Sequence, residues 1–255
     1  MALKGFISEI AALSKRYNLA HENVPANVLK KNPGFDDFTP ESKVARLRDG
    51  HDGVLHDFAP SVARLQGEID VAAKALPAKI GRKKCPAVTS SDASERLVGE
   101  LQLKSVSDFL AKNPDAGAIG IEARDCFALG RLDAFWRYVE HMRQSIPPGG
   151  PTTDEGRAML AELNETLSNV DVSDVMELER EQAQFPVAQR AIAEFSRQVS
   201  LGRERVVLPE IWPLLSEEDR QKAMAYLETT GSLVERVSVR QRIAQAMGSE
   251  LRLVS

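Results

Sequence analysis

The sequence lacks any apolar run long enough to cross a membrane. A transmembrane helix needs about 20 consecutive apolar residues, and no such run occurs among the 255 residues. The apolar stretch near the N-terminus is short and is interrupted by Glu9, which is unlike a secretory signal peptide. We therefore expect a protein without a membrane partner and without secretion by a signal peptide, located in the cytoplasm or in a particle assembled there.

Cysteine is scarce, and the common catalytic motifs are missing. Cys85 and Cys126 are the only two cysteines and form no CxxC pair, which excludes a disulfide scaffold and the usual zinc-ligand spacing. The patterns GxGxxG, GxxxxGK[ST], HExxH and GxSxG are also absent. We expect no metal, no cofactor and no enzymatic activity. An enzyme of unfamiliar type would have to use His51, His56 or His141 with acidic neighbours.

Neither positive nor negative charge dominates the sequence. The net charge is −4, both signs are interspersed, and the longest basic run is the triplet 82–84. Nucleic-acid-binding domains usually show a basic excess, because Lys and Arg displace counterions from phosphates. Nucleic acid is therefore not indicated as a partner. The exclusion is partial, because folding can still bring basic residues together on one face.

What is present is helical periodicity. Aromatic residues make up only 5% of the chain, and Ala, Leu and Val dominate its apolar part, which favours helices packed on helices. The sequence predicts an all-α fold, with a long kinked N-terminal helix or helical hairpin followed by a multi-helix bundle. The predicted parts are an N-terminal helix with an irregular linker at 1–38, the long hairpin or kinked helix at 39–80, a helical bundle at 90–146, and a C-terminal helical region packing on it at 152–255.

The first predicted helix spans about residues 2–16 and is amphipathic. Its apolar residues fall on one face at helical spacing, namely Leu3, Phe6, Ile7, Ile10 and Leu13. Residues 18–39 lose this pattern and contain Pro25 and Pro33, so they are predicted to be irregular. Such a linker would let the first helix dock on a neighbouring copy.

The strongest helical signal lies between Val44 and Leu76, where most apolar residues recur at intervals of three or four. Thr39 is a suitable N-cap for this helix. Pro60 removes one helical hydrogen bond, so we expect either one bent helix or two helices that meet there. The chain from Pro77 to Ser91 is predicted to be a loop.

His51 stands in this seam where an apolar residue is expected. Histidines and carboxylates cluster between His51 and Asp57, which raises the alternative of a metal or acid–base site. His51 and His56 are five residues apart, however, which is about 140° around a helix, whereas metal pairs on a helix need three or four residues. We interpret His51 as a polar residue that fixes register or partner choice.

Capping signals and breaks place the later helices. Asp92 with Glu95 matches a capping box, before an apolar face predicted from Leu97, Val98, Leu101, Val106, Phe109 and Leu110. Gly130 is predicted to end one helix and allow a tight reversal. After the Pro/Gly break at 146–151, Thr152 is predicted to start another helix.

The last third of the chain is less regular. Ser173 is predicted to cap a helix that Pro186 interrupts. Residues 205–215 are expected to be extended or to form one turn of 3₁₀ helix. Further helices are predicted from Ser216 to Gly231 and, last, up to Met247.

The candidate interface residues come from these apolar faces. The aromatic segment at Trp136 is predicted to be core, with an interface anchor as the alternative. The segment at Trp212 suits a core element and a docking element equally well. The candidate interface comprises Phe6, Ile10, Val44, Leu47, His51, Phe58, Trp136 and Trp212.

The middle of the chain has a recognisable layout. It consists of the segments Glu95–Leu101 and Ile121–Phe135, followed by a Pro/Gly loop and another predicted helix. This layout resembles that of small helical proteins encoded in the structural regions of tailed phages, over about residues 40–170. The resemblance implies a virion or particle-assembly component that works in an oligomer. It assigns no role to any single residue.

We therefore expect a non-enzymatic structural or assembly protein that acts through helix–helix contacts, as a homo-oligomer or with other proteins of an assembly. The alternative is an intracellular adaptor or regulatory module that binds one protein partner. The first hypothesis rests on the long apolar seam and the amphipathic first helix. The second predicts one exposed apolar patch, around Trp212.

Overall fold

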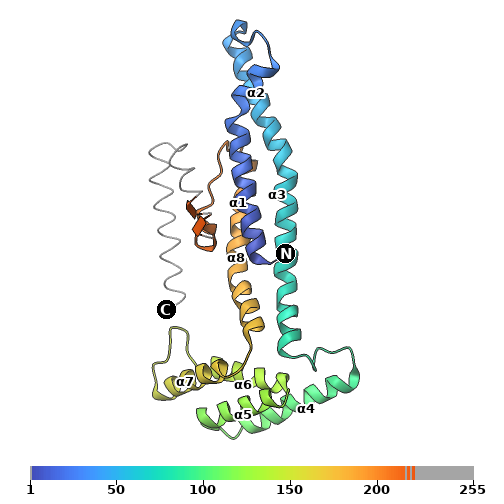
Figure 1. Ribbon diagram of the computed structural model, residues 1–255, viewed down its shortest axis with the longest axis vertical. Helices are drawn as coiled ribbons and strands as arrows, with labels where there is room; N and C mark the ends of the chain where they lie inside the picture. Colours follow the sequence, from blue (N-terminus) through green and yellow to red (C-terminus); the bar gives the residue numbers. More distant parts are fainter. Residues whose placement is uncertain (1, 216, 219, 222–255) are drawn as a thin grey trace. The chain divides into compact units, whose positions relative to one another are not determined.

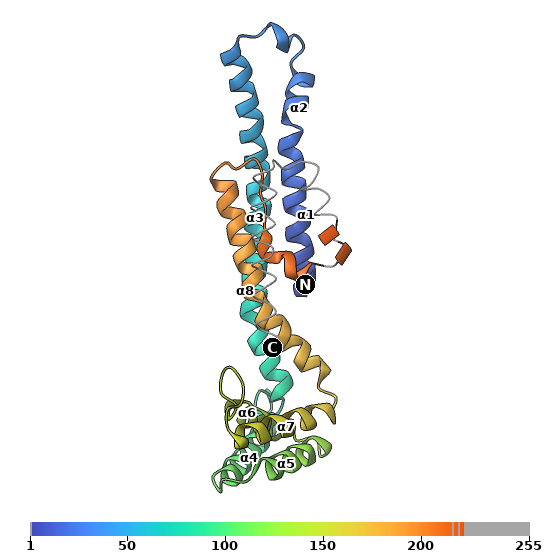
Figure 2. The same ribbon diagram turned by 90° about the vertical axis from the view of Figure 1, so that its left-hand side faces the viewer.

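The prediction of an all-α fold is confirmed by a computed structural model, which describes residues 2–215, 217–218 and 220–221. No strand occurs in this part of the chain. The helices, shown in Figures 1 and 2, are α1 (Leu3–Glu22), α2 (Val24–Lys31), the 3₁₀ helix η1 (Phe35–Asp37), α3 (Pro40–Lys84), α4 (Ala93–Leu110), α5 (Ala116–Ala128), α6 (Leu132–Gln144), α7 (Asp154–Ser168), α8 (Ser173–Ser200) and the 3₁₀ helix η2 (Pro209–Leu214).

The chain divides into two compact units. Unit 1 comprises Met1–Ala73 and Glu181–Ser255, and unit 2 comprises Lys74–Arg180. The boundaries therefore fall inside α3 and inside α8. The predicted C-terminal range 152–255 is divided between the units, because α7 belongs to unit 2 and most of α8 belongs to unit 1.

Unit 1 is built on α1, the first part of α3 and the second part of α8, which lie side by side (Figures 1 and 2). Phe6 on α1 packs edge-on against Phe185 on α8, with ring centroids 6.1 Å apart. The amide of Gln189 on α8 donates a hydrogen bond of 2.8 Å to Asp70 on α3. The apolar face of the first helix is thus buried inside its own unit, and does not use the docking on a neighbouring copy that an irregular linker would have allowed.

The long helix α3 continues through both Pro60 and Pro77. The alternative of two helices that meet at Pro60 is therefore wrong, and the loop predicted from Pro77 begins only after the end of α3. Packing explains the continuity. Val62 and Leu65 are buried just after Pro60, and burying each such side chain stabilises by about 1.5–3 kcal/mol. This offsets the cost of about 3 kcal/mol for a proline inside a helix.

The segment between the first two predicted helices is more regular than expected. α1 continues to Glu22, and α2 follows from Val24. α2 packs closely on α3, since a Cβ atom added at Gly50 would lie 2.7 Å from Val24 Cγ1. A glycine on α3 thus permits a close approach that supports a helix of only eight residues.

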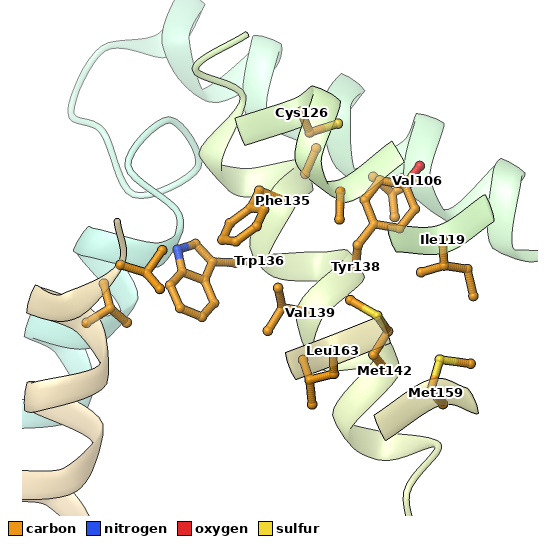
Figure 3. Packing of buried hydrophobic residues seen from close by; sticks show 14 residues of the cluster. Val106, Ile119, Cys126, Phe135, Trp136, Tyr138, Val139, Met142, Met159 and Leu163 are labelled. Atoms are coloured by element: carbon orange, nitrogen blue, oxygen red, sulfur yellow. The ribbon is translucent and has the colours of Figure 1, made fainter. Parts of the chain in front are cut away.

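The core of unit 2 gathers around α6 (Figure 3). α6 contacts α4, α5 and α7, and Phe135, Val139 and Met142 on it are fully covered. Phe127 of α5 packs edge-on against Phe135, with ring centroids 5.1 Å apart. Trp136 belongs to the same cluster, in agreement with its prediction as a core residue.

The helix ends of unit 2 follow local chemistry. The carboxylate of Asp92 accepts hydrogen bonds from two backbone N–H groups in the first turn of α4, which confirms Asp92 as the N-cap, whereas the Glu95 carboxylate accepts from the Ser90 hydroxyl and not from the Asp92 N–H group that a capping box would use. Gly130 has a φ of +69°, the left-handed conformation expected at the end of a helix. Thr153, rather than Thr152, caps α7.

The last described elements differ from the prediction in one respect. α8 runs from Ser173 through Pro186 to Ser200, so the interruption expected at Pro186 is not observed. Residues 205–215 contain η2, in agreement with the expected turn of 3₁₀ helix. The helices predicted from Ser216 onward and up to Met247 lie outside the described residues.

Candidate helix–helix interaction site

Four of the predicted interface residues are buried inside their own units. The exposed fractions are 2% for Phe6, 0% for Ile10, 2% for Trp136 and 8% for Trp212. These side chains form the cores of the units and offer no free surface to a partner.

Val44 differs from the other candidates, because 59% of its surface is exposed. Leu47 and Phe58, in the same seam of α3, are half-buried. Phe58 packs edge-on against Tyr17 of α1, with ring centroids 5.4 Å apart. The seam is therefore covered by α1 near its middle and keeps an exposed apolar side chain near the start of α3.

His51 makes its contact within the chain. Its Nδ1 atom lies 2.8 Å from Nδ1 of His21 on α1, and the two rings stack with their centroids 5.1 Å apart. One ring donates and the other accepts, since a neutral imidazole carries a single N–H. His51 Nε2 also lies 3.7 Å from Oε1 of Glu204. The pair joins α1 to α3 within unit 1.

Burial controls the protonation of His21. The pKa of His21 lies below its ordinary value of 6.5, mainly because burial disfavours the imidazolium and further because of His51, while Glu204 acts in the opposite sense. Tyr17 lies edge-on to His21, with ring centroids 4.6 Å apart, and burial raises the pKa of this tyrosine to about 12. The environment is that of a structural contact.

The remaining histidines do not join this pair. His56 is exposed on α3, and His141 belongs to unit 2. In the part of the chain that the structure describes, no group of three or more His, Cys, Asp or Glu side chains is placed to hold a metal ion. The geometry therefore adds no support to the metal or acid–base alternative.

Among the described helices, the largest group of exposed apolar side chains on one helix consists of residues that the sequence prediction assigned to a single apolar face. It lies on α4, where 57% of Leu97, 51% of Val98 and 58% of Leu101 are exposed. The prediction of a single apolar face for this helix is wrong. Its large apolar side chains are covered only in its second half, with Val106 buried and Phe109 edge-on to Tyr138 of α6 at 5.8 Å between ring centroids.

The apolar residues of α4 form two stripes on opposite sides of the helix. Leu97 and Val106 are nine residues apart, which is about 180° around a helix at about 100° per residue. Because Val106 points into the core of unit 2 (Figure 3), Leu97 points away from it. The spacing that shows this was present in the sequence.

A close approach at Gly99 holds α4 in this orientation. A Cβ atom at this position would lie 2.8 Å from both Cγ2 and N of Val88, so α4 lies directly against the preceding loop. Gly99 stands two residues, or about 200°, from both Leu97 and Leu101. The loop therefore holds one side of the helix and directs the two leucines to solvent.

The loop is held in turn by the buried carboxylate of Asp133, at the start of α6. Oδ2 of Asp133 accepts a hydrogen bond of 3.1 Å from Ala87 N, and Oδ1 accepts one of 2.9 Å from Val88 N. Asp133 is 1% exposed, and a carboxylate is retained at such a position when hydrogen bonds replace its hydration. Asp133, the loop and Gly99 thus form one chain of contacts that presents Leu97 and Leu101.

Among the described residues, no helix has both the length and the apolar character needed to span a bilayer. Comparisons of the chain with protein-family models, with curated proteins and with solved structures find no match. The exposed surface of Leu97, Val98 and Leu101, called the α4 face below, is therefore assigned from its own geometry as a candidate site of helix–helix contact.

Proposed function

We propose that the protein is a non-enzymatic assembly protein that associates through helix–helix contacts, with the α4 face as a contact surface. One observation carries this proposal. More than half of Leu97 and of Leu101 is exposed, on a helix whose opposite side is held by the close approach of Gly99 to Val88. An apolar stripe on a rigidly held helix is what a partner helix or groove recognises.

The energy available from this surface is moderate. Burying a whole leucine side chain stabilises by about 1.5–3 kcal/mol, so covering the exposed halves of Leu97 and Leu101 contributes about 2 kcal/mol per copy. Association of two free chains costs at least about 4 kcal/mol in lost motion. The contact is therefore suited to copies that other contacts already hold together.

In an assembled particle, other contacts already hold the copies together. Each copy has several neighbours, so once a first contact has formed, the next one forms at a high effective concentration. The resemblance of the sequence layout to tailed-phage structural proteins is the reason for proposing a virion component as the specific setting. The α4 face lies within the region Glu95–Leu101 that carries this resemblance.

The adaptor alternative depends on an exposed apolar patch around Trp212. Ile211 and Trp212 are both buried, so the patch expected there is missing from the surface.

The test is the mass of the full-length chain in solution, measured by light scattering over a range of concentrations. We expect the mass of the wild type to rise with concentration, and that of Leu97→Gln/Leu101→Gln to rise much less. Glutamine removes the apolar surface while keeping good helix propensity. Leu129→Gln, at a leucine of unit 2 that is 65% exposed, is the matched control and should behave as the wild type. A wild type that stays monomeric at every concentration would overturn the proposal.

A further inference from the structure

We infer that the partner of the α4 face is the α4 face of a second copy of this chain, lying antiparallel to the first. This inference rests on the proposed function and names the partner. It depends on the order of the charges beside the leucines, as well as on their exposure.

Four charged residues run along α4 at intervals of four with alternating sign: Arg96, Glu100, Lys104 and Asp108. All four are exposed, and none of them forms an ion pair with another described residue. Residues four apart lie in one row on a helix. At about 100° per residue the row turns around the helix, so that Lys104 and Asp108 lie beside Leu97 and Leu101, Glu100 lies next to them on one flank, and Arg96 lies nearer the side of Gly99.

An antiparallel pairing of two α4 helices matches the charged row with itself. A twofold axis level with position 102 sets Arg96 opposite Asp108 of the second copy. The same axis sets Glu100 opposite Lys104 of the second copy, and the symmetry repeats both contacts. A parallel pairing in register would set each charge against its own like, which is unfavourable. This axis sets opposite charges level with each other, and Glu100 and Lys104, which lie on the same flank of the leucines, carry the preference for a second copy in the antiparallel direction.

The same axis brings the leucines together. Leu101 stands one residue from the axis, so its two copies lie about 3 Å apart along the helix direction and pack on each other. Leu97 falls between Lys104 and Asp108 of the second copy, where the aliphatic stem of the lysine covers it. The contact therefore has an apolar centre with charged flanks, the usual arrangement of a protein interface.

The size of the contact sets its strength. Two helices of 18 residues bury less than the roughly 800 Å² per partner of a standard stable interface. The isolated dimer is therefore expected to be weak and dependent on concentration, in keeping with a contact that acts inside a larger assembly.

Charge reversal in the full-length chain tests the pairing. Glu100→Lys alone sets two positive charges against each other, and Lys104→Glu alone sets two negative ones. Each is expected to raise the dimer dissociation constant about tenfold, because two attractive contacts become repulsive. The combined change Glu100→Lys/Lys104→Glu restores opposite charges and should return the constant to within about threefold of the wild type.

Sedimentation equilibrium measures these constants. Glu177→Lys, at an exposed glutamate on α8, is the matched control for the change in net charge and should leave the constant unchanged. Far-UV circular dichroism checks that each variant keeps its helix content. Recovery in the combined variant is the decisive result, because unfolding in a single variant cannot produce it.

Cysteine cross-linking tests the direction of the pairing. In the antiparallel contact the two copies of residue 101 are adjacent, whereas the two copies of residue 97 lie about 15 Å apart along the axis. Leu101→Cys is therefore expected to form a disulfide-linked dimer under mild oxidation, and Leu97→Cys is not. The wild type, with Cys126 buried and Cys85 half-buried, is the blank. Equal cross-linking at both positions would indicate a parallel contact and overturn the inference.

Failure of this inference is distinguishable from failure of the proposed function. One outcome is that Leu97→Gln/Leu101→Gln abolishes self-association while Glu100→Lys/Lys104→Glu fails to recover the affinity that the single charge variants lose. The α4 face then binds a different helix, and the inference alone is overturned. If the wild type is monomeric at every concentration, both are overturned. If the wild type associates and neither the leucines nor the charges matter, both the inference and the assignment of the α4 face are overturned.

Discussion

His21 Nδ1 and His51 Nδ1 lie 2.8 Å apart, and the hydrogen bond between them joins α1 to α3. This bond needs one ring nitrogen that carries a proton and one that does not. Protonation of both rings would remove the acceptor and place two positive charges in contact. The lowered pKa of His21, caused mainly by its burial and then by His51, reflects the cost of charging it.

We predict that the protein loses stability as the pH falls below 6.5, the ordinary pKa of His21. Above this value His21 is neutral in the folded and the unfolded chain, and its contribution is fully present. Below it the unfolded chain binds a proton that the folded chain still refuses, so stability falls until the pH passes the lowered pKa of the folded state. Urea unfolding at a series of pH values, followed by circular dichroism, measures this loss.

Two variants separate the histidine pair from other titrating groups. His21→Gln removes the buried group and should flatten the pH dependence. His56→Gln, at an exposed histidine of α3, should keep the dependence of the wild type. Parallel curves for His21→Gln and the wild type would show that other groups, such as carboxylates, cause the loss.

We predict that Asp133 contributes more to the free energy of unfolding than any other buried polar residue of unit 2. In Asp133→Ala the N–H groups of Ala87 and Val88 lose their acceptor, and hydrogen bonds to a charged group contribute about 1.5–3 kcal/mol each. We expect the free energy of unfolding to fall by about 3 kcal/mol. Asp133→Asn keeps one carbonyl oxygen and should lose about half as much. Urea unfolding provides the measurement.

The control for Asp133 is an aspartate whose partner lies at the surface. Asp174, with 73% of its side chain exposed, pairs with Lys83, and exposed ion pairs contribute less than about 1 kcal/mol. Equal losses for Asp133→Ala and Asp174→Ala would mean that the loop does not depend on the buried carboxylate.

The helix ends were predictable because each depends on one residue and its own backbone. Asp92 caps α4 through its carboxylate, and Gly130 ends α5 because it lacks a Cβ atom. The continuity of the long helices was not predictable in the same way. Pro60 and Pro186 lie inside helices because buried residues near them hold the helix together, and burial is a property of the tertiary structure.

The candidate site was predictable in part. The spacing of Leu97 and Val106 assigns them to opposite sides of α4, but which side is covered depends on the contact of Gly99 with Val88 and on the distant Asp133. The charged row was visible in the sequence, yet charges at intervals of four are also common on ordinary solvated helices. The exposed leucines beside the row are what connect it with a partner.

Gly99 tests whether α4 is held by its contact with the loop. In an exposed helix a change from glycine to alanine stabilises by about 1 kcal/mol. At Gly99 the added methyl group would lie 2.8 Å from the backbone nitrogen of Val88 and 3.0 Å from Cβ of Ala87. Relief of these contacts requires a shift of backbone, so we predict that Gly99→Ala lowers the free energy of unfolding by about 1–3 kcal/mol, measured with urea.

Gly67 is the matched control, because a Cβ atom there would meet nothing within 4 Å. Gly67→Ala should therefore raise the free energy of unfolding, by up to about 1 kcal/mol. The shift of α4 in Gly99→Ala should also weaken self-association, since Leu97 and Leu101 would lose their fixed direction. If Gly99→Ala instead stabilises the chain as Gly67→Ala does, α4 separates from the loop at little cost. The α4 face would then be formed only on binding, and its affinity would be lower by the cost of ordering the helix.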